Sequence, residues 1–179
     1  MRRLLALAAL AAAPALAQDR PILLPTRDVD VTYHASFGNQ SYDQRWRYRA
    51  ADERLRLDLP DPGNYMIADH RAHTAAMVSD SARSVLEVPL PDPTGLGQSQ
   101  AFTRVGTATV ARVPCTEWQT RDMAGADTVA CITADGVMLR ARHGGQVVVE
   151  ATKVTYGPLD PGAFVIPPGY KRESPPTRR

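Results

Sequence analysis

The residues in this sequence best suited to bind a metal ion are His70 and His73, which follow Asp69 in a His-x-x-His spacing. Imidazole nitrogens and carboxylate oxygens are common ligands of transition metals. We expect these residues at the tip of a hairpin around His70–Arg71, where a tight turn need not bring the two rings together. The other two histidines occur without a motif. The sequence therefore favours exposed turn histidines, and we predict no metal site and no cofactor.

The only two cysteines, Cys115 and Cys131, favour a structural disulfide. A structural zinc site needs about four ligands, and no second close pair of cysteines exists to supply them. A redox site typically has Cys-x-x-Cys spacing, which is absent. A hairpin centred on Met123 would set the two cysteines directly opposite, with Cβ atoms about 4.5–5.5 Å apart, near the reach of a disulfide.

Five arginines share one face of the predicted strands: Arg45, Arg47, Arg49, Arg54 and Arg56. Such a face could bind anionic headgroups, phosphate or an acidic protein partner, because guanidinium groups form paired hydrogen bonds with these anions. The alternative is a solvated face that is neutralised by Asp28, Asp30, Asp43 and Asp58. Cross-strand pairing supplies these carboxylates as partners, which favours the neutralised face.

Sequence templates for enzymes fail one by one. There is no Gly-x-Ser-x-Gly elbow, and the run Gly95–Gly97 stops short of a dinucleotide-binding loop. Three glutamates on predicted strands could pair in a cleft: Glu87, Glu117 and Glu150. Glu117 and Glu150 more simply balance the charges of Arg140 and Arg142. Because a catalytic site needs a nucleophile or base with a partner, we expect a protein that is not an enzyme.

The elements that carry these residues are strands, because apolar and polar residues alternate with period two between turns every eight to twelve residues. A turn centred on Gly38–Asn39 sets Val31 opposite Trp46, and a turn centred on Ala51–Asp52 sets Trp46 opposite Leu57. A slip of one residue would flip every side chain to the other face. Both turns give one apolar and one charged face, which indicates an antiparallel meander.

Later segments continue the same pattern, with further strands predicted over 64–69, 73–78, 84–90 and 100–113, the last bent at Gly106. Residues 91–99 are proline-rich and indicate a loop or a lid-like excursion. The pair Asp135–Gly136 favours a tight hairpin that sets Ile132 opposite Leu139. A three-residue loop at 143–145 would then set Ala141 opposite Val147. No amphipathic helix of four turns is predicted.

One group of apolar residues on the predicted inner face could line a ligand groove or simply form the core. Its members are Tyr33, Trp46, Tyr48, Leu55, Leu57 and Trp118.

The first seventeen residues are typical of a signal peptide. Met1–Arg3 is basic, Leu4–Ala13 is apolar, and Ala15–Ala17 offers a small-x-small cleavage site. We expect residues 18–170 to form one exported, periplasmic domain and residues 171–179 to form a polar tail. No later segment is apolar enough for a transmembrane helix, which needs about 20 residues. Without Arg2 and Arg3, 19 basic residues balance 19 acidic ones, so nucleic-acid binding is not expected.

Five segments, in this order, carry a resemblance to a known family: residues 28–33 (DVDVTY), 45–49 (RWRYR), 54–58 (RLRLD), 67–71 (IADHR) and 164–170 (FVIPPGY). With them the chain resembles the uncharacterised DUF4412-type periplasmic proteins and, more remotely, the LolA/LolB-like lipoprotein carriers. This resemblance implies an antiparallel sheet curved into a half-barrel, whose apolar concave side holds acyl chains in the carriers.

Two functions follow from these observations as expectations. The first is a non-enzymatic exported protein that binds a lipid, an acyl chain or another apolar ligand on the concave face of the sheet. The second is an envelope protein-interaction module that binds a protein partner through the arginine face.

Overall fold

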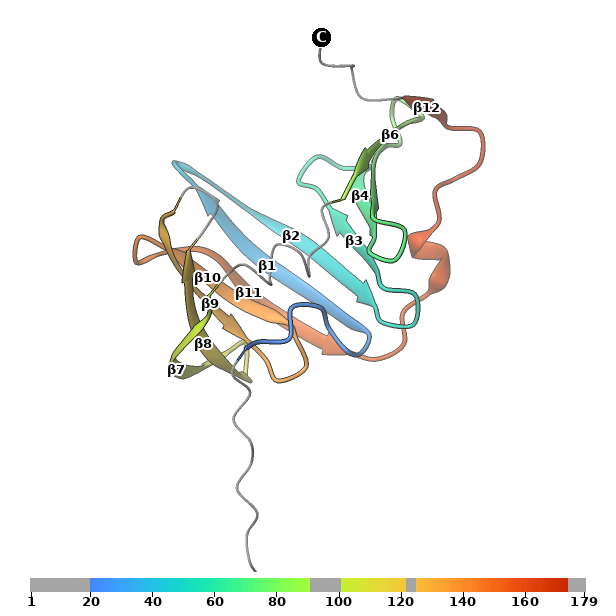
Figure 1. The fold of residues 1–179 in the computed structure, drawn as a ribbon. Coiled ribbons are helices and arrows are strands. Elements are labelled where there is room, and N and C mark those ends of the chain that lie inside the picture. The colour runs from blue at the N-terminus through green and yellow to red at the C-terminus, as the bar shows by residue number, and fades with distance from the viewer. Residues whose placement is uncertain (1–19, 91–100, 122–124, 174–179) are drawn as a thin grey trace, which may run out of the picture.

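The computed structural model describes residues 20–90, 101–121 and 125–173, which form a single open and curled sheet (Figure 1). In this part of the chain, twelve strands lie in the order β12-β6-β5-β4-β3-β2-β1-β11-β10-β9-β8-β7. The helical element there is one 3-10 turn, η1 (Pro161–Phe164). The predicted mainly-β, half-barrel class is confirmed. The expected signal peptide and the loop 91–99 lie outside the described residues.

The first half of the sheet is an uninterrupted meander of hairpins. Its strands are β1 (Val29–Phe37), β2 (Gln40–Arg49), β3 (Arg54–Asp58), β4 (Asn64–Asp69), β5 (Thr74–Ser79) and β6 (Ser84–Pro89). The predicted register is confirmed, because Val31 lies opposite Trp46 and Trp46 lies opposite Leu57. The polar and apolar faces of β1–β3 are therefore placed as expected.

The second half of the sheet consists of β7–β11, and its strand β11 pairs with β1. Its strands are β7 (Thr103–Val110), β8 (Val113–Arg121), β9 (Asp127–Ile132), β10 (Met138–His143) and β11 (Gln146–Tyr156). The single strand predicted over 100–113 is wrong. The chain turns at Ala111–Arg112, where both residues have positive φ, as in the tightest hairpin turns, and no glycine or asparagine marks that turn.

Bulges shift two of the predicted pairings in this half. Ile132 lies opposite Met138 rather than Leu139, because β10 holds an extra residue between Met138 and Arg140. Ala141 lies opposite Val149 rather than Val147, because the strands β10 and β11 slip after Ala141. A bulge opposes two residues to one and is not visible as a change in the alternation of residue types.

The C-terminal segment is more ordered than we expected. Residues 171–173, assigned to a polar tail from the sequence, form β12 (Lys171–Glu173), which pairs in parallel with the edge of β6. Residues 174–179 lie outside the described residues. Between β11 and β12 the chain passes through η1 and runs along the outer side of β3–β6, away from the half that contains β7–β10 (Figure 1).

The buried residues form two main groups, one on each side of the curl. The larger group fills the space between β1–β2 and β7–β11 and includes Val29, Val31, Tyr33, Tyr48 and Leu139. The smaller group lies on the outer side of β4–β6, where Ile166 and Tyr170 of the C-terminal segment pack against it. Its members are Tyr65, Ile67, Ala76, Val78 and Val85. The concave side of β3–β6 therefore does not share the packing of either group, apart from Leu55, which packs against the larger one.

Candidate functional site: a concave apolar surface

Five apolar side chains lie opposite one another in a row that crosses β2 to β6. We call this row the apolar ladder; its members are Trp46, Leu57, Met66, Met77 and Leu86. Four gaps of about 4.8 Å between neighbouring strands make the ladder roughly 19 Å long. Its side chains are only partly buried, and that of Met77 remains 36% exposed. A strip of this length and exposure can contact an extended apolar group.

A second row lies beside the apolar ladder on the same face. It consists of Tyr48, Leu55, Ala68, Ala75 and Val88, which are directly opposite one another in the register. Ala68 and Ala75 are small and buried, and they lie next to Met66 and Met77, whose flexible thioether side chains are more exposed. Methionine adapts its shape to irregular apolar partners, which suits a binding surface.

Charge is separated completely across this part of the sheet. Every Asp, Glu, Lys and Arg of strands β2–β6 falls at a register position on the outer face. On the face that carries the apolar ladder, the polar residues of β4–β6 are Asn64, Ser79 and Ser84, which lie together at one margin of the apolar strip. An uncharged and partly exposed strip of this kind is the type of surface that marks an interaction or ligand site.

The six residues predicted to line a ligand groove do not all lie on this surface. Trp46, Tyr48, Leu55 and Leu57 belong to the two rows just described. Tyr33 and Tyr48 are 4% and 1% exposed and fill the main core, although Tyr48 also stacks on Trp46 with ring centroids 5.9 Å apart. Ligand contact by these residues remains a prediction, whereas their packing in the core is a feature of the structure.

Trp118 lies in β8, which is far from β2–β6 in the strand order of the sheet. It is buried in a separate small cluster with Ala130 and Ile132, against which Phe102 packs. The sequence did not point to Met66, Met77 and Leu86. The available signal was their position opposite Leu57, which required the registers of three further hairpins.

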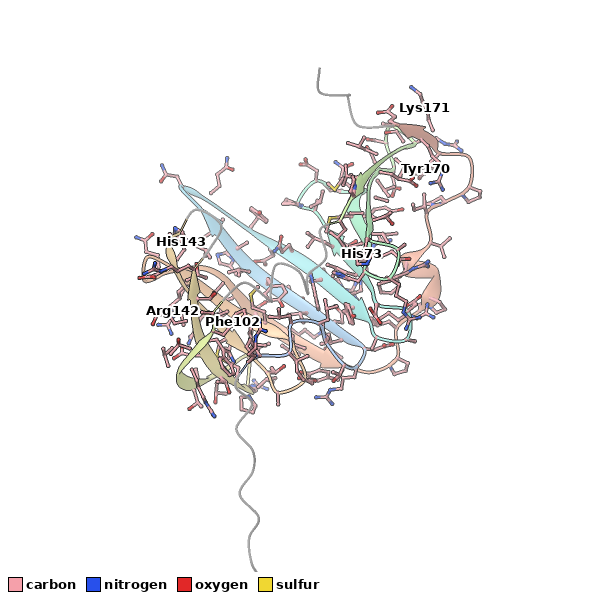
Figure 2. The ribbon with its side chains drawn as sticks, viewed as in Figure 1. His73, Phe102, Arg142, His143, Tyr170 and Lys171 are labelled. Atoms are coloured by element: carbon pink, nitrogen blue, oxygen red, sulfur yellow. A yellow bond between two sulfur atoms is a disulfide. The ribbon has the colours of Figure 1, made fainter. Side chains whose placement is uncertain are left out.

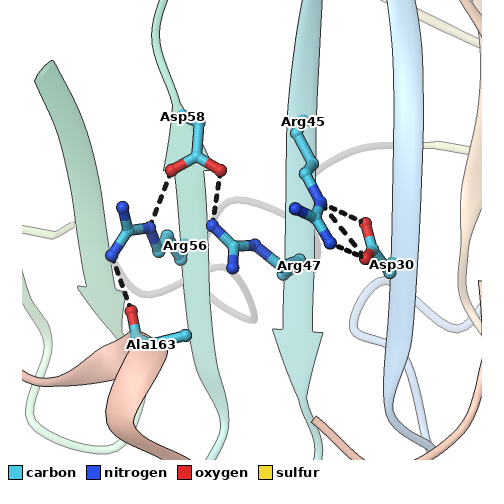
Figure 3. Close-up of polar contacts among 6 residues, drawn as sticks. All are labelled: Asp30, Arg45, Arg47, Arg56, Asp58 and Ala163. Carbon is cyan, nitrogen blue, oxygen red and sulfur yellow. Dashed lines mark hydrogen bonds and ion pairs between the residues drawn. The ribbon is translucent and has the colours of Figure 1, made fainter. Parts of the chain in front are cut away.

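The outer face carries the five predicted arginines, and ion pairs neutralise them. Figure 3 shows the ion pairs of Arg45, Arg47 and Arg56. Arg45 donates to Asp30 with an Nη2–Oδ2 distance of 2.5 Å. Asp58 accepts from two arginines, Arg47 at 2.5 Å and Arg56 at 2.7 Å. Because Arg47 and Arg56 lie directly opposite each other, this single carboxylate offsets their mutual repulsion.

The remaining two arginines form a similar arrangement near the next turn. Arg49 and Arg54 lie opposite each other and both approach Asp52, while Arg54 also pairs with Asp69 at 3.1 Å. Burial disfavours the ionised form of Asp69, but hydrogen bonds from the Ala72 amide and Arg54 outweigh it and lower the pKa of that carboxyl. The neutralised state of the arginine face is therefore the one that the structure shows.

The C-terminal segment covers part of this outer face as well. Arg56 donates from Nη1 to the Ala163 carbonyl at 2.8 Å, and its guanidinium lies 3.7 Å from the centre of the Tyr65 ring. Of the carboxylates predicted as arginine partners, Asp30 and Asp58 have that role. Asp28 instead accepts from the backbone amides of Ala50 and Leu159, and Asp43 hydrogen-bonds His34.

The predicted histidine pair lies in the turn between β4 and β5, where His73 is exposed as expected but His70 is partly buried. His73 and His143 are on opposite halves of the molecule (Figure 2). His70 packs near Tyr48, and burial lowers the pKa of its imidazole, with Glu53 and Asp69 opposing the shift. The described residues contain no group of three or more His, Cys, Asp or Glu side chains that could hold a metal ion.

The two glutamates expected to balance arginines do so. Glu117 accepts from Arg140 at 3.0 Å and from Arg142, and Arg140 also lies 3.5 Å from Glu150. Glu87, the third glutamate, pairs with Arg172 of β12. Glu87 is therefore held in an ion pair on the outer face of the sheet, and Glu117 and Glu150 are held in ion pairs in its second half.

Cys115 and Cys131 form the predicted disulfide. Their register differs from the prediction, because Cys131 lies opposite Glu117 and the cysteines are diagonal neighbours with Cα atoms 5.4 Å apart. Met123, on which the predicted hairpin was centred, lies outside the described residues. Within the described part of the chain, no helix is long and apolar enough to cross a membrane.

Comparison with solved structures identifies proteins with the same fold. The chain is similar to an uncharacterized conserved protein from Thermus thermophilus, with a TM-score of 0.62 and 12% identity over 84% of this chain and 91% of that one. It is also similar to MucB in the Pseudomonas aeruginosa MucA/MucB complex, with a TM-score of 0.55 and 15% identity over 77% and 55% of the two chains.

A third similarity, to PNGF-II, has a TM-score of 0.56 and 14% identity over 84% of this chain and 31% of that one. The chain thus spans about half the length of MucB and a third of PNGF-II. No protein-family model and no curated protein matches the sequence. The MucB similarity fits the remote resemblance to LolA-like proteins, while the DUF4412 assignment remains a prediction.

Proposed function

We propose that this chain is an exported binding protein without enzymatic activity, which takes an acyl chain or a similar extended apolar ligand on the apolar ladder. The observation that carries the proposal is the complete separation of charge across β2–β6. All the charged side chains of these strands lie on the outer face, and the concave face keeps large, partly exposed apolar side chains.

The geometry of the ladder supports an elongated ligand. The row runs across the strands for roughly 19 Å, as four inter-strand spacings require. Covering such side chains removes apolar area from water, which is worth about 25 cal/mol per Å². A ligand that lies along the row contacts all five side chains, whereas a compact ligand contacts two or three.

A second candidate function is capture of an apolar segment of a protein partner on the same surface. It is favoured by the similarity to MucB, which was solved as a complex with MucA. A helix of about 13 residues is as long as the ladder, at 1.5 Å per residue. The arginine face is less suited to this role, because its charges are paired and the C-terminal segment covers part of it.

Fluorescence titration with pyrene-labelled palmitate tests the first function. Met77→Asp places a charge in the ladder, and Met138→Asp is the matched control because Met138 is similarly exposed, at 38%, but lies in β10. We expect Met77→Asp to weaken binding at least ~10-fold, which corresponds to about 1.4 kcal/mol, and Met138→Asp to change it less than about twofold on the same scale.

The two candidates give different results when a synthetic amphipathic helical peptide is titrated in parallel. Binding of the palmitate probe with the expected sensitivity to Met77→Asp supports the first function. Binding of the peptide with that sensitivity, and no binding of palmitate, supports the second. If neither probe binds, or both variants behave alike, the ladder is not the binding surface.

A further inference from the structure

The two edges of the sheet differ sharply. One edge ends in β12, which has only three residues, all of them charged and exposed. Short charged edge strands prevent unwanted pairing with other chains. The other edge ends in β7, which has eight residues and a single charge, Arg104, and which pairs only with β8 among the described strands. The β7 edge thus lacks the protection given to the β12 edge.

The side chains of β7 are suited to strand pairing. The strand is rich in threonine, valine and alanine, and Val105 is 48% exposed, more than is usual for a large apolar side chain. Threonine and valine fit the pleated surface of a sheet well. A bulge between Arg104 and Gly106 is the one irregularity, and it leaves the stretch from Gly106 to Val110 in regular register with β8.

We propose that β7 is a homodimer interface, at which the β7 strands of two copies pair antiparallel around a two-fold axis at Thr107. In this register Thr107 lies opposite its own symmetry mate, and Gly106 lies opposite Ala108 of the second copy. With the bulge counted as one position, Arg104 faces Thr109 of the second copy. The only charge of each strand therefore meets no like charge, and two-fold pairing satisfies both edges at once.

A cavity beside this edge gives the second copy a further contact. It has a volume of about 410 Å³ and is lined by Thr107, Thr109, Thr116 and Pro114, together with the disulfide residue Cys115. In the register with β8, Arg104 lies on the same face as Thr107 and Thr109, because the bulge restores their common orientation. Arg104 of each copy thus lies over the cavity of the other, where threonine oxygens can accept from its guanidinium.

The mass of the mature chain in solution, measured by sedimentation and by light scattering over a concentration series, tests this proposal. We expect a dimer that Thr107→Lys dissociates, since it sets two ammonium groups opposite each other and raises the dimer Kd at least ~10-fold. Thr155→Lys, which changes an exposed residue of β11, is the matched control and leaves the dimer intact.

Cross-linking distinguishes this register from other modes of association. Thr107→Cys gives a disulfide-linked dimer under mild oxidation, because directly opposed Cβ atoms lie about 4.5–5.5 Å apart, and Thr155→Cys does not. A monomer at every concentration overturns the proposal, as does a dimer that Thr107→Lys leaves unchanged. Binding of an extended peptide to a monomeric protein at β7 would mean that the edge serves a different partner, and it also overturns the proposal.

Discussion

Asp58 is the carboxylate whose loss should cost the fold most, because it separates two arginines that lie directly opposite each other. Breaking a fully buried ion pair costs about 3–5 kcal/mol, and breaking an exposed pair costs about 0–1 kcal/mol. The side chains of Arg47, Arg56 and Asp58 are 14%, 20% and 29% exposed. They are thus closer to the buried case, and we expect Asp58→Asn to lower the free energy of unfolding by about 2–3 kcal/mol.

Urea unfolding of the disulfide-intact protein measures this loss. Asp30→Asn is the matched control, because its partner Arg45 is 53% exposed and its loss should cost at most about 1 kcal/mol. Adding Arg47→Gln to Asp58→Asn should restore part of the stability, since it removes the unpaired charge. If Asp58→Asn and Asp30→Asn agree within about 0.5 kcal/mol, the bridging role of Asp58 is refuted.

Three further changes test other parts of the structure by the same unfolding assay. Gly136→Ala should cost roughly 3 kcal/mol or more, because its φ is +91° and a Cβ would lie 2.5 Å from the Leu24 carbonyl oxygen. Replacing Cys115 and Cys131 by alanine should cost about 3 kcal/mol by opening a loop of about 15 residues. His70→Gln should flatten the fall in stability below pH 6.5, the usual pKa of histidine.

The sign of the histidine effect follows from its lowered pKa. Between that pKa and 6.5 the unfolded chain binds more protons than the folded one, so stability falls as the pH decreases. For the glycine, Gly144→Ala is the control, because its φ is also positive but no atom lies within 4 Å of the added Cβ. Equal costs for the two glycine changes would contradict the close contact at Gly136.

The disulfide test has its own comparison. The same double replacement should leave the denaturant midpoint nearly unchanged when both proteins are measured under reducing conditions. A difference of several kcal/mol that persists after reduction would show that side-chain packing, rather than the covalent link, accounts for the loss.

The sequence predicts the first three strands correctly because two independent patterns agree there. The apolar residues around Trp46 and Leu57 alternate strictly with charged residues, and short turns set one register that satisfies both faces. The same reasoning gives the paired state of the arginine face. It fails at Met138–Arg140 and after Ala141, where a bulge inserts a residue without altering the composition of the strand.

The apolar ladder could be only half predicted from the sequence, for a different reason. In β4 both faces are apolar, with Tyr65 and Ile67 on the outer side and Met66 and Ala68 on the concave side. Alternation of residue types therefore cannot tell the two faces apart. The C-terminal segment resolves the question in the structure, because Ile166 packs on the outer side and leaves the concave side uncovered by that segment.

Photo-cross-linking with a diazirine-bearing fatty acid, followed by mass spectrometric mapping of the labelled residues, tests the central claim most directly. We predict that labels concentrate on Trp46, Leu57, Met66, Met77 and Leu86, and that excess unlabelled palmitate removes them. Labels on the outer residues Tyr65 and Val78, or labels spread evenly over the protein, would contradict the claim that the uncharged concave face is the binding surface.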